Sequence, residues 1–300
     1  MSQTLTKKGV QITSPPVIKS TELVSKLVSA GLAACVAEAI TLPMDTAKIK
    51  LQVEGGTLMS TMRTIAAADG MKGFFRGLVP GLHRQLGFCT IRLGLYDTTK
   101  DFYMKNTPLN EGLPLRFAAG ISTAVAAVCI AQPTEVVKIR MQAAKSGTVR
   151  YSGTLAAYYK IAVTEGTKGL WSGLGPNITR LSICNIGEVV TYDTVKTSIL
   201  RRGWMEDAFP LHFTSAVCAG FVTTTLTSPV DVVKTRYVNS SPGEYRSAVQ
   251  CARVLAREGG FKIFYKGCVP SFFRITGWNL IMFMSYEQLR KVVSKKLKGY

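Results

Sequence analysis

Apolar residues occur along this chain in six long stretches that are separated by shorter polar segments. Three of the stretches are rich in Ala, Val, Gly, Ser and Thr, and the other three each begin at a proline. They cover residues 23–42, 80–96, 117–132, 176–192, 213–228 and 270–286. With its flanks, each stretch approaches the roughly 20 residues that an α-helix needs to cross a bilayer. The pattern therefore predicts six transmembrane helices.

The polar segments between paired stretches carry short amphipathic patterns, for example over 155–163. They predict three short interfacial helices. A soluble helical solenoid also has a fixed repeat, but its helices place charges on their outer face. Segment 27–42 holds one charge, Glu38, and segment 117–132 holds none. The hydropathy pattern therefore favours a membrane protein over a solenoid.

Three sequence markers recur in the same order three times. A Pro-x-acid-x-x-Lys motif begins at Pro43, Pro133 and Pro229, an aromatic-x-Gly element ends at Gly77, Gly173 and Gly267, and an aromatic-acid-x-x-base motif begins at Tyr96, Tyr192 and Tyr286. Self-similarity at a fixed period indicates a repeat architecture. We expect a mobile tail over 1–20 and repeats over 21–105, 112–202 and 209–296.

Composition narrows the class of protein. Lys and Arg number 37 against 18 acids, which gives a net charge of +19, and only 18% of residues are charged. A disordered polyanion, a collagen and a small disulfide scaffold are excluded. Attraction to anionic lipids and an electropositive funnel for anions explain the basic excess better than a nucleic-acid partner. No hydrolase triad, P-loop, dinucleotide fingerprint or metal-ligand cluster is found, so we expect no enzyme, cofactor or metal.

The recurring acids and bases predict two rings of ion pairs. Threefold symmetry brings the Pro-x-acid motifs together and pairs each acid with the lysine of the next repeat. The expected pairs are Asp45–Lys138, Glu135–Lys234 and Asp231–Lys48. The closing motifs allow a second ring at the other end, with Asp97–Lys196, Asp193–Arg290 and Glu287–Lys100. We interpret the rings as two gates; the alternative is a set of surface pairs worth about 0–1 kcal/mol each.

An arginine stands thirteen residues before each closing acid, at Arg84, Arg180 and Arg274. Thirteen helical residues span about 20 Å, which is well inside the bilayer. No carboxylate is expected at an equivalent position, so the three guanidinium groups form a layer that repels itself unless an anion occupies it. Arginine suits phosphate and carboxylate ligands. The alternative is that backbone carbonyls or lipid headgroups satisfy each arginine.

A few polar residues break the threefold symmetry. Arg92 and Glu188 hold equivalent positions and could pair inside the cavity. Glu38 is a lone acid in the first span, seven residues before Asp45. A carboxylate at bilayer depth can carry a proton, and the alternative is that a water-filled cavity solvates it. Trp278 lies one turn beyond the third arginine and either stacks on a ligand base or faces lipid.

These motifs resemble the mitochondrial carrier family over nearly the whole chain. The strings over 42–52, 132–142 and 228–245 are most similar to those of uncoupling proteins. The resemblance implies an all-α, multi-pass protein of the inner mitochondrial membrane. It has six helices in three pseudo-threefold repeats around a central cavity, with three short matrix-side helices. The ring at the Pro-x-acid motifs becomes a matrix gate that includes Gln52 and Gln142, and the other ring becomes a cytoplasmic gate.

The same resemblance implies a function. Uncoupling proteins move protons and anions with the help of fatty acids, and purine nucleotides (GDP, GTP, ADP, ATP) inhibit them. It implies nucleotide binding by Arg84, Arg180 and Arg274, a proton pathway through Glu38 and Glu188, and cardiolipin at the aromatic-x-Gly elements. From their positions we add Arg92, Glu188 and Trp278 to the expected nucleotide or anion site, and we expect a monomer. The alternative is an exchanger of C4 dicarboxylates or phosphate without proton leak. The chain departs from the pattern at Ser172, where a base is expected, and at Val238, where a glutamine is expected.

Overall fold

The computed structural model describes residues 20–106, 113–145, 151–203, 209–241 and 243–298. Within these ranges it leaves undescribed the side chains of residues 20–27, 89, 92, 93, 97, 113, 114, 116, 117, 209, 213 and 294–298. The tail expected over 1–20 lies outside the described residues, apart from residue 20.

Every regular element in the described ranges is helical, and the order long–short–long occurs three times. The long helices are α1 (Ser20–Glu54), α3 (Leu78–Asn106), α4 (Leu113–Gln142), α6 (Leu174–Arg201), α7 (Phe209–Asn239) and α9 (Cys268–Lys298). The short ones are α2 (Leu58–Phe74), α5 (Thr154–Glu165) and α8 (Ala248–Gly259), with 3-10 turns η1 (Thr167–Trp171) and η2 (Phe261–Tyr265). The all-α threefold architecture expected from the sequence is confirmed.

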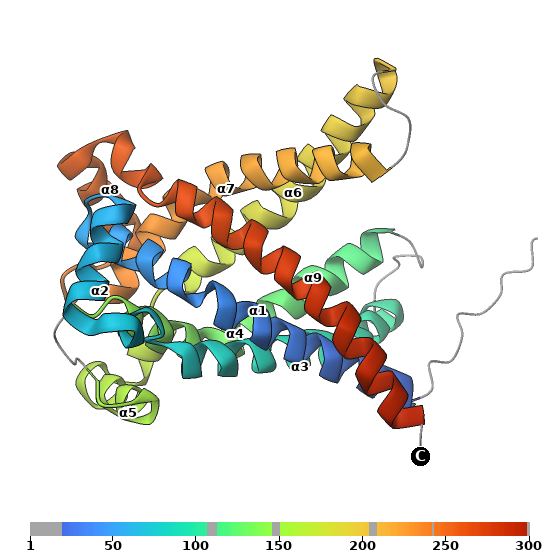
Figure 1. Cartoon of the computed structure of the whole chain (residues 1–300), viewed down its shortest axis with the longest axis horizontal. Helices are drawn as coiled ribbons and strands as arrows, with labels where there is room; N and C mark the ends of the chain where they lie inside the picture. Colours follow the sequence, from blue (N-terminus) through green and yellow to red (C-terminus); the bar gives the residue numbers. More distant parts are fainter. Residues whose placement is uncertain (1–19, 107–112, 146–150, 204–208, 242, 299–300) are drawn as a thin grey trace, which may run out of the picture.

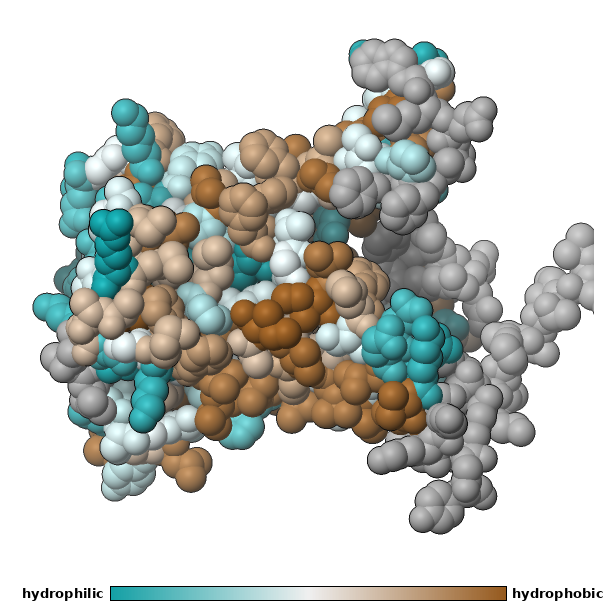
Figure 2. All heavy atoms as spheres, viewed as in Figure 1, coloured by the Kyte–Doolittle hydropathy of each residue, from teal (hydrophilic) through white to brown (hydrophobic). Residues whose placement is uncertain are grey.

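Three of the long helices are apolar enough over their length to cross a membrane by composition alone, within Val28–Glu54, Ala118–Gln142 and Pro210–Asn239. The helices α3, α6 and α9 are less apolar because they carry the arginines and the closing motifs. Apolar side chains gather over the middle of the face seen in Figure 2, and hydrophilic ones over the end that carries α2 and α8. This distribution suits a protein with a lipid-covered middle.

The first, third and fifth long helices (α1, α4 and α7), which we call the odd helices, do not stop at their Pro-x-acid motifs. Pro43, Pro133 and Pro229 all lie inside helices, which continue to Glu54, Gln142 and Asn239. A proline removes one backbone hydrogen bond, but the residues that follow are buried against other repeats, as with Ile49 and Val137. That burial keeps the chain helical beyond the proline.

The other three long helices, α3, α6 and α9, each begin directly after a glycine with positive φ. The φ values are 84° at Gly77, 76° at Gly173 and 87° at Gly267. A side chain there would also collide with a neighbouring repeat, since an added Cβ would lie 3.1 Å from Gln142 and 2.4 Å from Val238. Glycine is therefore required for both conformation and space. The prolines at 80, 176 and 270 occupy the first turn, where a missing N–H costs nothing.

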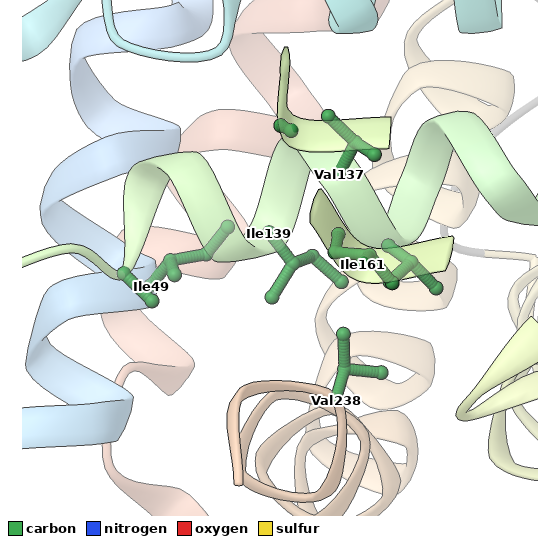
Figure 3. Packing of buried hydrophobic residues seen from close by; sticks show 8 residues of the cluster. Ile49, Val137, Ile139, Ile161 and Val238 are labelled. Atoms are coloured by element: carbon green, nitrogen blue, oxygen red, sulfur yellow. The ribbon is translucent and has the colours of Figure 1, made fainter. Parts of the chain in front are cut away.

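The three short helices bury one face against the odd helices. Thr57 caps α2 through a reciprocal bond with Ser60, and Ser247 caps α8 by accepting from the backbone N–H of Gln250. On α5, Ala157 and Ile161 are buried. Figure 3 shows Ile161 packed with Ile49, Val137, Ile139 and Val238, so one apolar cluster joins α1, α4, α5 and α7.

The last long helix closes the bundle onto the first. α1 packs against both α9 and α3, α3 packs against α4, and α6 packs against α7. In Figure 1 the long helices crowd together at the end that carries α2, α5 and α8, and they spread apart toward the other end, where the chain terminates. We call these the narrow end and the wide end.

Candidate functional site

Three buried ion pairs join the odd helices at the narrow end. Lys138 Nζ lies 2.5 Å from Asp45 Oδ2, Lys234 Nζ lies 2.7 Å from Glu135 Oε1, and Lys48 Nζ lies 2.8 Å from Asp231 Oδ2. These are the three pairs expected from the repeat. The lysine side chains are at most 8% exposed, so the pairs are interior contacts and not surface ones.

The three cavity arginines also pair with these carboxylates. Arg274 Nε lies 3.2 Å from Asp45 Oδ1, Arg84 Nε lies 3.1 Å from Glu135 Oε2, and Arg180 Nε lies 2.5 Å from Asp231 Oδ1. The expectation of an arginine layer without carboxylates is wrong. Counting back from the closing acid places each arginine deep in the bundle, but an antiparallel odd helix brings its own acid to the same level. Each motif carboxylate therefore bridges one lysine and one arginine.

A cavity that is open to solvent lies over this network and has a volume of about 160 Å³. All six cations of the network line it, together with the three motif carboxylates. With the nearby Glu38, four carboxylates face six cations, which leaves an excess of two positive charges in the described site. Fixed positive charge in a concave, low-dielectric site attracts anions.

Glu38 belongs to the same network. It is 1% exposed. Its Oε1 accepts from Lys138 Nζ at 2.5 Å and its Oε2 accepts from Gln85 Nε2 at 2.8 Å. The alternative that water solvates this acid is therefore wrong. Lys138 holds two carboxylates at once, unlike the other two gate lysines.

Two glutamines, which we call the glutamine braces, bond to residues in or next to the motifs beside the ion pairs. Gln142 Nε2 lies 3.5 Å from Asp45 Oδ2 and donates to Thr46 Oγ1 at 3.1 Å. Thr235 Oγ1 donates to Gln52 Oε1 at 2.9 Å. At the third equivalent position, Val238 is fully buried in the apolar cluster of Figure 3.

Reasoning from the sequence missed three polar residues of this site, namely Gln85, Gln132 and Asn177. Asn177 Oδ1 accepts from Lys234 Nζ at 2.9 Å, and its Nδ2 donates to Gln132 Oε1 at 2.8 Å. The signal was present in the repeat, because the residues after the three prolines are Gly81, Asn177 and Ser271. Asn177 carries an amide where the other two repeats have glycine and serine, so this position departs from the threefold symmetry.

Two of the three pairs expected at the wide end are not formed between the side chains that the structure describes. Among the described side chains, Asp193 and Arg290 are exposed and do not pair, and Glu287 pairs with Lys291 of its own helix at 3.1 Å instead of with Lys100. The side chain of Asp97, the expected partner of Lys196, lies outside the described residues. The expected pairs Asp193–Arg290 and Glu287–Lys100 are therefore absent here. The reason is the spread of the helices at this end (Figure 1).

Two further predicted side chains, Glu188 and Trp278, take no part in the ion pairs described above. Glu188 is exposed, and the side chain of Arg92, its expected partner, is outside the described residues. Trp278 is half-buried, and its indole N–H is covered without a hydrogen-bond partner in the described structure. At the aromatic-x-Gly element of the first repeat, Arg76 pairs with Asp69 at 2.7 Å.

The sequence matches the mitochondrial carrier protein family over residues 19–107, 110–203 and 206–297. Three matches in tandem agree with the three helical units and the threefold network. The chain belongs to the mitochondrial carrier family. Its members are multi-pass transporters of the inner mitochondrial membrane, so this protein is a transporter and not an enzyme.

Similar proteins in this family carry uncoupling-protein names. The chain is 47% identical over 283 residues to mitochondrial brown fat uncoupling protein 1 of Ovis aries, which covers 90% of this chain and 92% of the relative. It is 46% identical over 285 residues to dicarboxylate carrier UCP2 of Danio rerio, with 89% and 92% covered. It is 45% identical over 287 residues to putative mitochondrial transporter UCP3 of Bos taurus, with 90% and 92% covered.

Proposed function

We propose that this carrier moves protons and small anions in the uncoupling-protein manner and that purine nucleotides bound in the central cavity inhibit it. The observation that carries the proposal is the sharing of Asp45, Glu135 and Asp231 between a lysine and an arginine. Nucleotide phosphates are bidentate partners for guanidinium groups. Arg84, Arg180 and Arg274, with Arg92, Glu188 and Trp278, would form the nucleotide site.

The network suggests how an anion works on the gate. An anion that enters from the wide end competes with the motif carboxylates for the three arginines. When an arginine turns to the anion, its carboxylate keeps only its lysine, and the ring at the narrow end is weaker. A small anion would then pass as the gate opens, whereas a larger nucleotide would hold the arginines apart from the gate and arrest the carrier. Asp97, Lys100, Asp193, Lys196, Glu287 and Arg290 would pair once the wide end closes.

Glu38 is the proposed proton carrier, with Glu188 nearer the wide end. Glu38 adjoins the gate through Lys138, so a change in its protonation changes the charge that the gate lysine experiences. Fatty acids are the proposed activators and cardiolipin the proposed lipid at the aromatic-x-Gly elements of a monomeric carrier. The deciding assay is fatty-acid-dependent proton flux in proteoliposomes, blocked by GDP or ATP.

A second candidate is exchange of C4 dicarboxylates or phosphate without proton leak. Two observations favour it: the cavity's excess of two positive charges suits a dianion, and one relative is named a dicarboxylate carrier. Malate or phosphate exchange that is insensitive to nucleotide, without proton flux, would select this candidate over the first.

A further inference from the structure

The two departures from the repeat pattern, Ser172 and Val238, lie in the same sector of the narrow end. Gly173, next to Ser172, is so close to Val238 that an added Cβ would lie 2.4 Å from its Cγ2. The equivalent glycines adjoin glutamines instead, with Gln142 Cγ at 3.1 Å and Gln52 Cγ at 3.2 Å. The ion pair of this sector is Glu135–Lys234. Val238 lies one helical turn beyond Lys234 on α7, at the position that Gln52 and Gln142 hold after the other two lysines.

A different polar chain supports that ion pair from the cavity side. Lys234 Nζ donates to Asn177 Oδ1 at 2.9 Å, Asn177 Nδ2 donates to Gln132 Oε1 at 2.8 Å, and Gln132 Nε2 donates to the carbonyl of Ser172 at 2.8 Å. Gln132 is completely buried. These three hydrogen bonds form an amide chain that connects Lys234 through Asn177 and Gln132 to the turn that precedes α6.

The other two repeats cannot form this chain. The residues equivalent to Gln132, directly before the motif prolines, are Leu42 and Ser228, and those equivalent to Asn177 are Gly81 and Ser271. Ser228 and Ser271 donate to backbone carbonyls, of Phe264 and Gly267 respectively. The amide chain is therefore present only in the sector where the glutamine brace is missing.

We propose that Asn177, oriented by Gln132, is a gate-positioning residue that replaces the absent glutamine brace of the Glu135–Lys234 pair. This inference rests on the proposed role of that pair as a gate. Asn177 lies on α6 three residues before Arg180, which itself contacts Asp231 on α7. Residues three apart share a helix face, so α6 holds both the acid and the lysine of the third motif. Release of Lys234 then requires α6 to move away from α7, and an anion that draws Arg180 from Asp231 loosens the same contact.

Asn177→Ala tests the proposal, with Ser271→Ala as the matched control. A hydrogen bond to a charged group that is lost from the closed state shifts the gate toward opening by roughly tenfold to a hundredfold. We expect faster exchange per folded molecule, an unchanged KM, and an unfolding temperature lower by roughly 2–4 °C. A merely structural defect would reduce turnover. Ser271→Ala, whose hydroxyl bonds within its own helix, should leave the exchange rate unchanged.

Gln132→Leu, which introduces the residue of the first repeat, supplies the second measurement. If Gln132 acts only through Asn177, the two substitutions together shift the unfolding temperature no more than Asn177→Ala alone. Additive shifts, or an Asn177→Ala carrier that matches Ser271→Ala in both rate and unfolding temperature, would overturn the proposal. Should the unmutated protein transport no anion, the proposed function fails, and the unfolding temperatures of the same variants still decide the role of Asn177.

Discussion

Arg274 Nε lies 3.2 Å from Asp45 Oδ1, and this contact joins the last membrane helix of the chain to the first. The same relation recurs between α3 and α4 and between α6 and α7, so a cavity arginine of one repeat contacts the motif carboxylate of the next. In the proposed function, these shared carboxylates couple ligand binding to gate strength without a relay of intermediate residues.

The first prediction concerns inhibitor binding. Arg84→Gln, Arg180→Gln and Arg274→Gln each remove a charge-assisted contact to phosphate, and each should weaken GDP binding by roughly 10- to 100-fold. Calorimetric titration of purified protein measures the effect. Arg76→Gln is a control because Arg76 pairs with Asp69 outside the cavity. Unchanged affinity in all three variants would remove the nucleotide site from this layer.

The gate lysines should differ in their contributions to stability. Lys138→Gln leaves two buried carboxylates, Asp45 and Glu38, without their lysine, and the expected loss is about 3–5 kcal/mol of unfolding free energy. Lys48→Gln should cost less, because it removes the lysine from one carboxylate, Asp231, and not from two. Thermal unfolding in detergent compares the two. Adding Glu38→Gln to Lys138→Gln should recover part of the loss, and equal effects of the two lysine variants would contradict the double pairing.

Glu38→Gln separates proton movement from anion movement. The amide keeps the shape of the side chain and can still accept from Lys138, but it cannot release a proton. Fatty-acid-dependent proton flux in proteoliposomes should fall at least tenfold, a loss of about 1.4 kcal/mol or more in transition-state stabilisation, while phosphate exchange persists. Gln85→Leu, which removes the neutral neighbour, should retain flux. Full proton flux in the Glu38→Gln protein would exclude this acid from the pathway.

Ion pairs at the wide end should matter only when that end closes. Asp193 and Arg290 are apart in this structure, so Asp193→Asn should leave the unfolding temperature of the GDP-bound protein unchanged. The same variant should slow anion exchange, since the closed wide end loses an ion pair. Combining Asp193→Arg with Arg290→Asp should restore part of the rate. A large loss of stability in the GDP-bound form would show that Asp193 has another partner.

The threefold repeat made most of this architecture accessible from the sequence. Apolar and amphipathic patterns predicted the six long and three short helices. The symmetry of the repeated motifs predicted which acid faces which lysine, because equivalent residues must meet around a common axis. The level of the arginines relative to the motif carboxylates was predicted less well. Counting from the closing motif alone placed Arg274 correctly along α9 but missed Asp45 beside it, because that contact depends on how far α1 continues beyond Pro43.

The asymmetric residues were the hardest to predict. Val238 could be recognised as a departure from the repeat pattern. A single sequence does not show that Asn177 on α6 faces Lys234 on α7. The wide end depends on conformation as well, because the same side chains pair or separate with the state of the carrier. The repeat boundaries at 21–105, 112–202 and 209–296 stay a prediction.

The close packing of α9 on α1 has a consequence for how the protein is made. During synthesis, Asp45 and one face of α1 lack their partner until α9, the last helix to be translated, is made (residues 268–298). A polypeptide truncated before that point would not be a smaller carrier. It would leave a carboxylate without its arginine and a seam open to lipid, which quality-control proteases of the organelle could recognise.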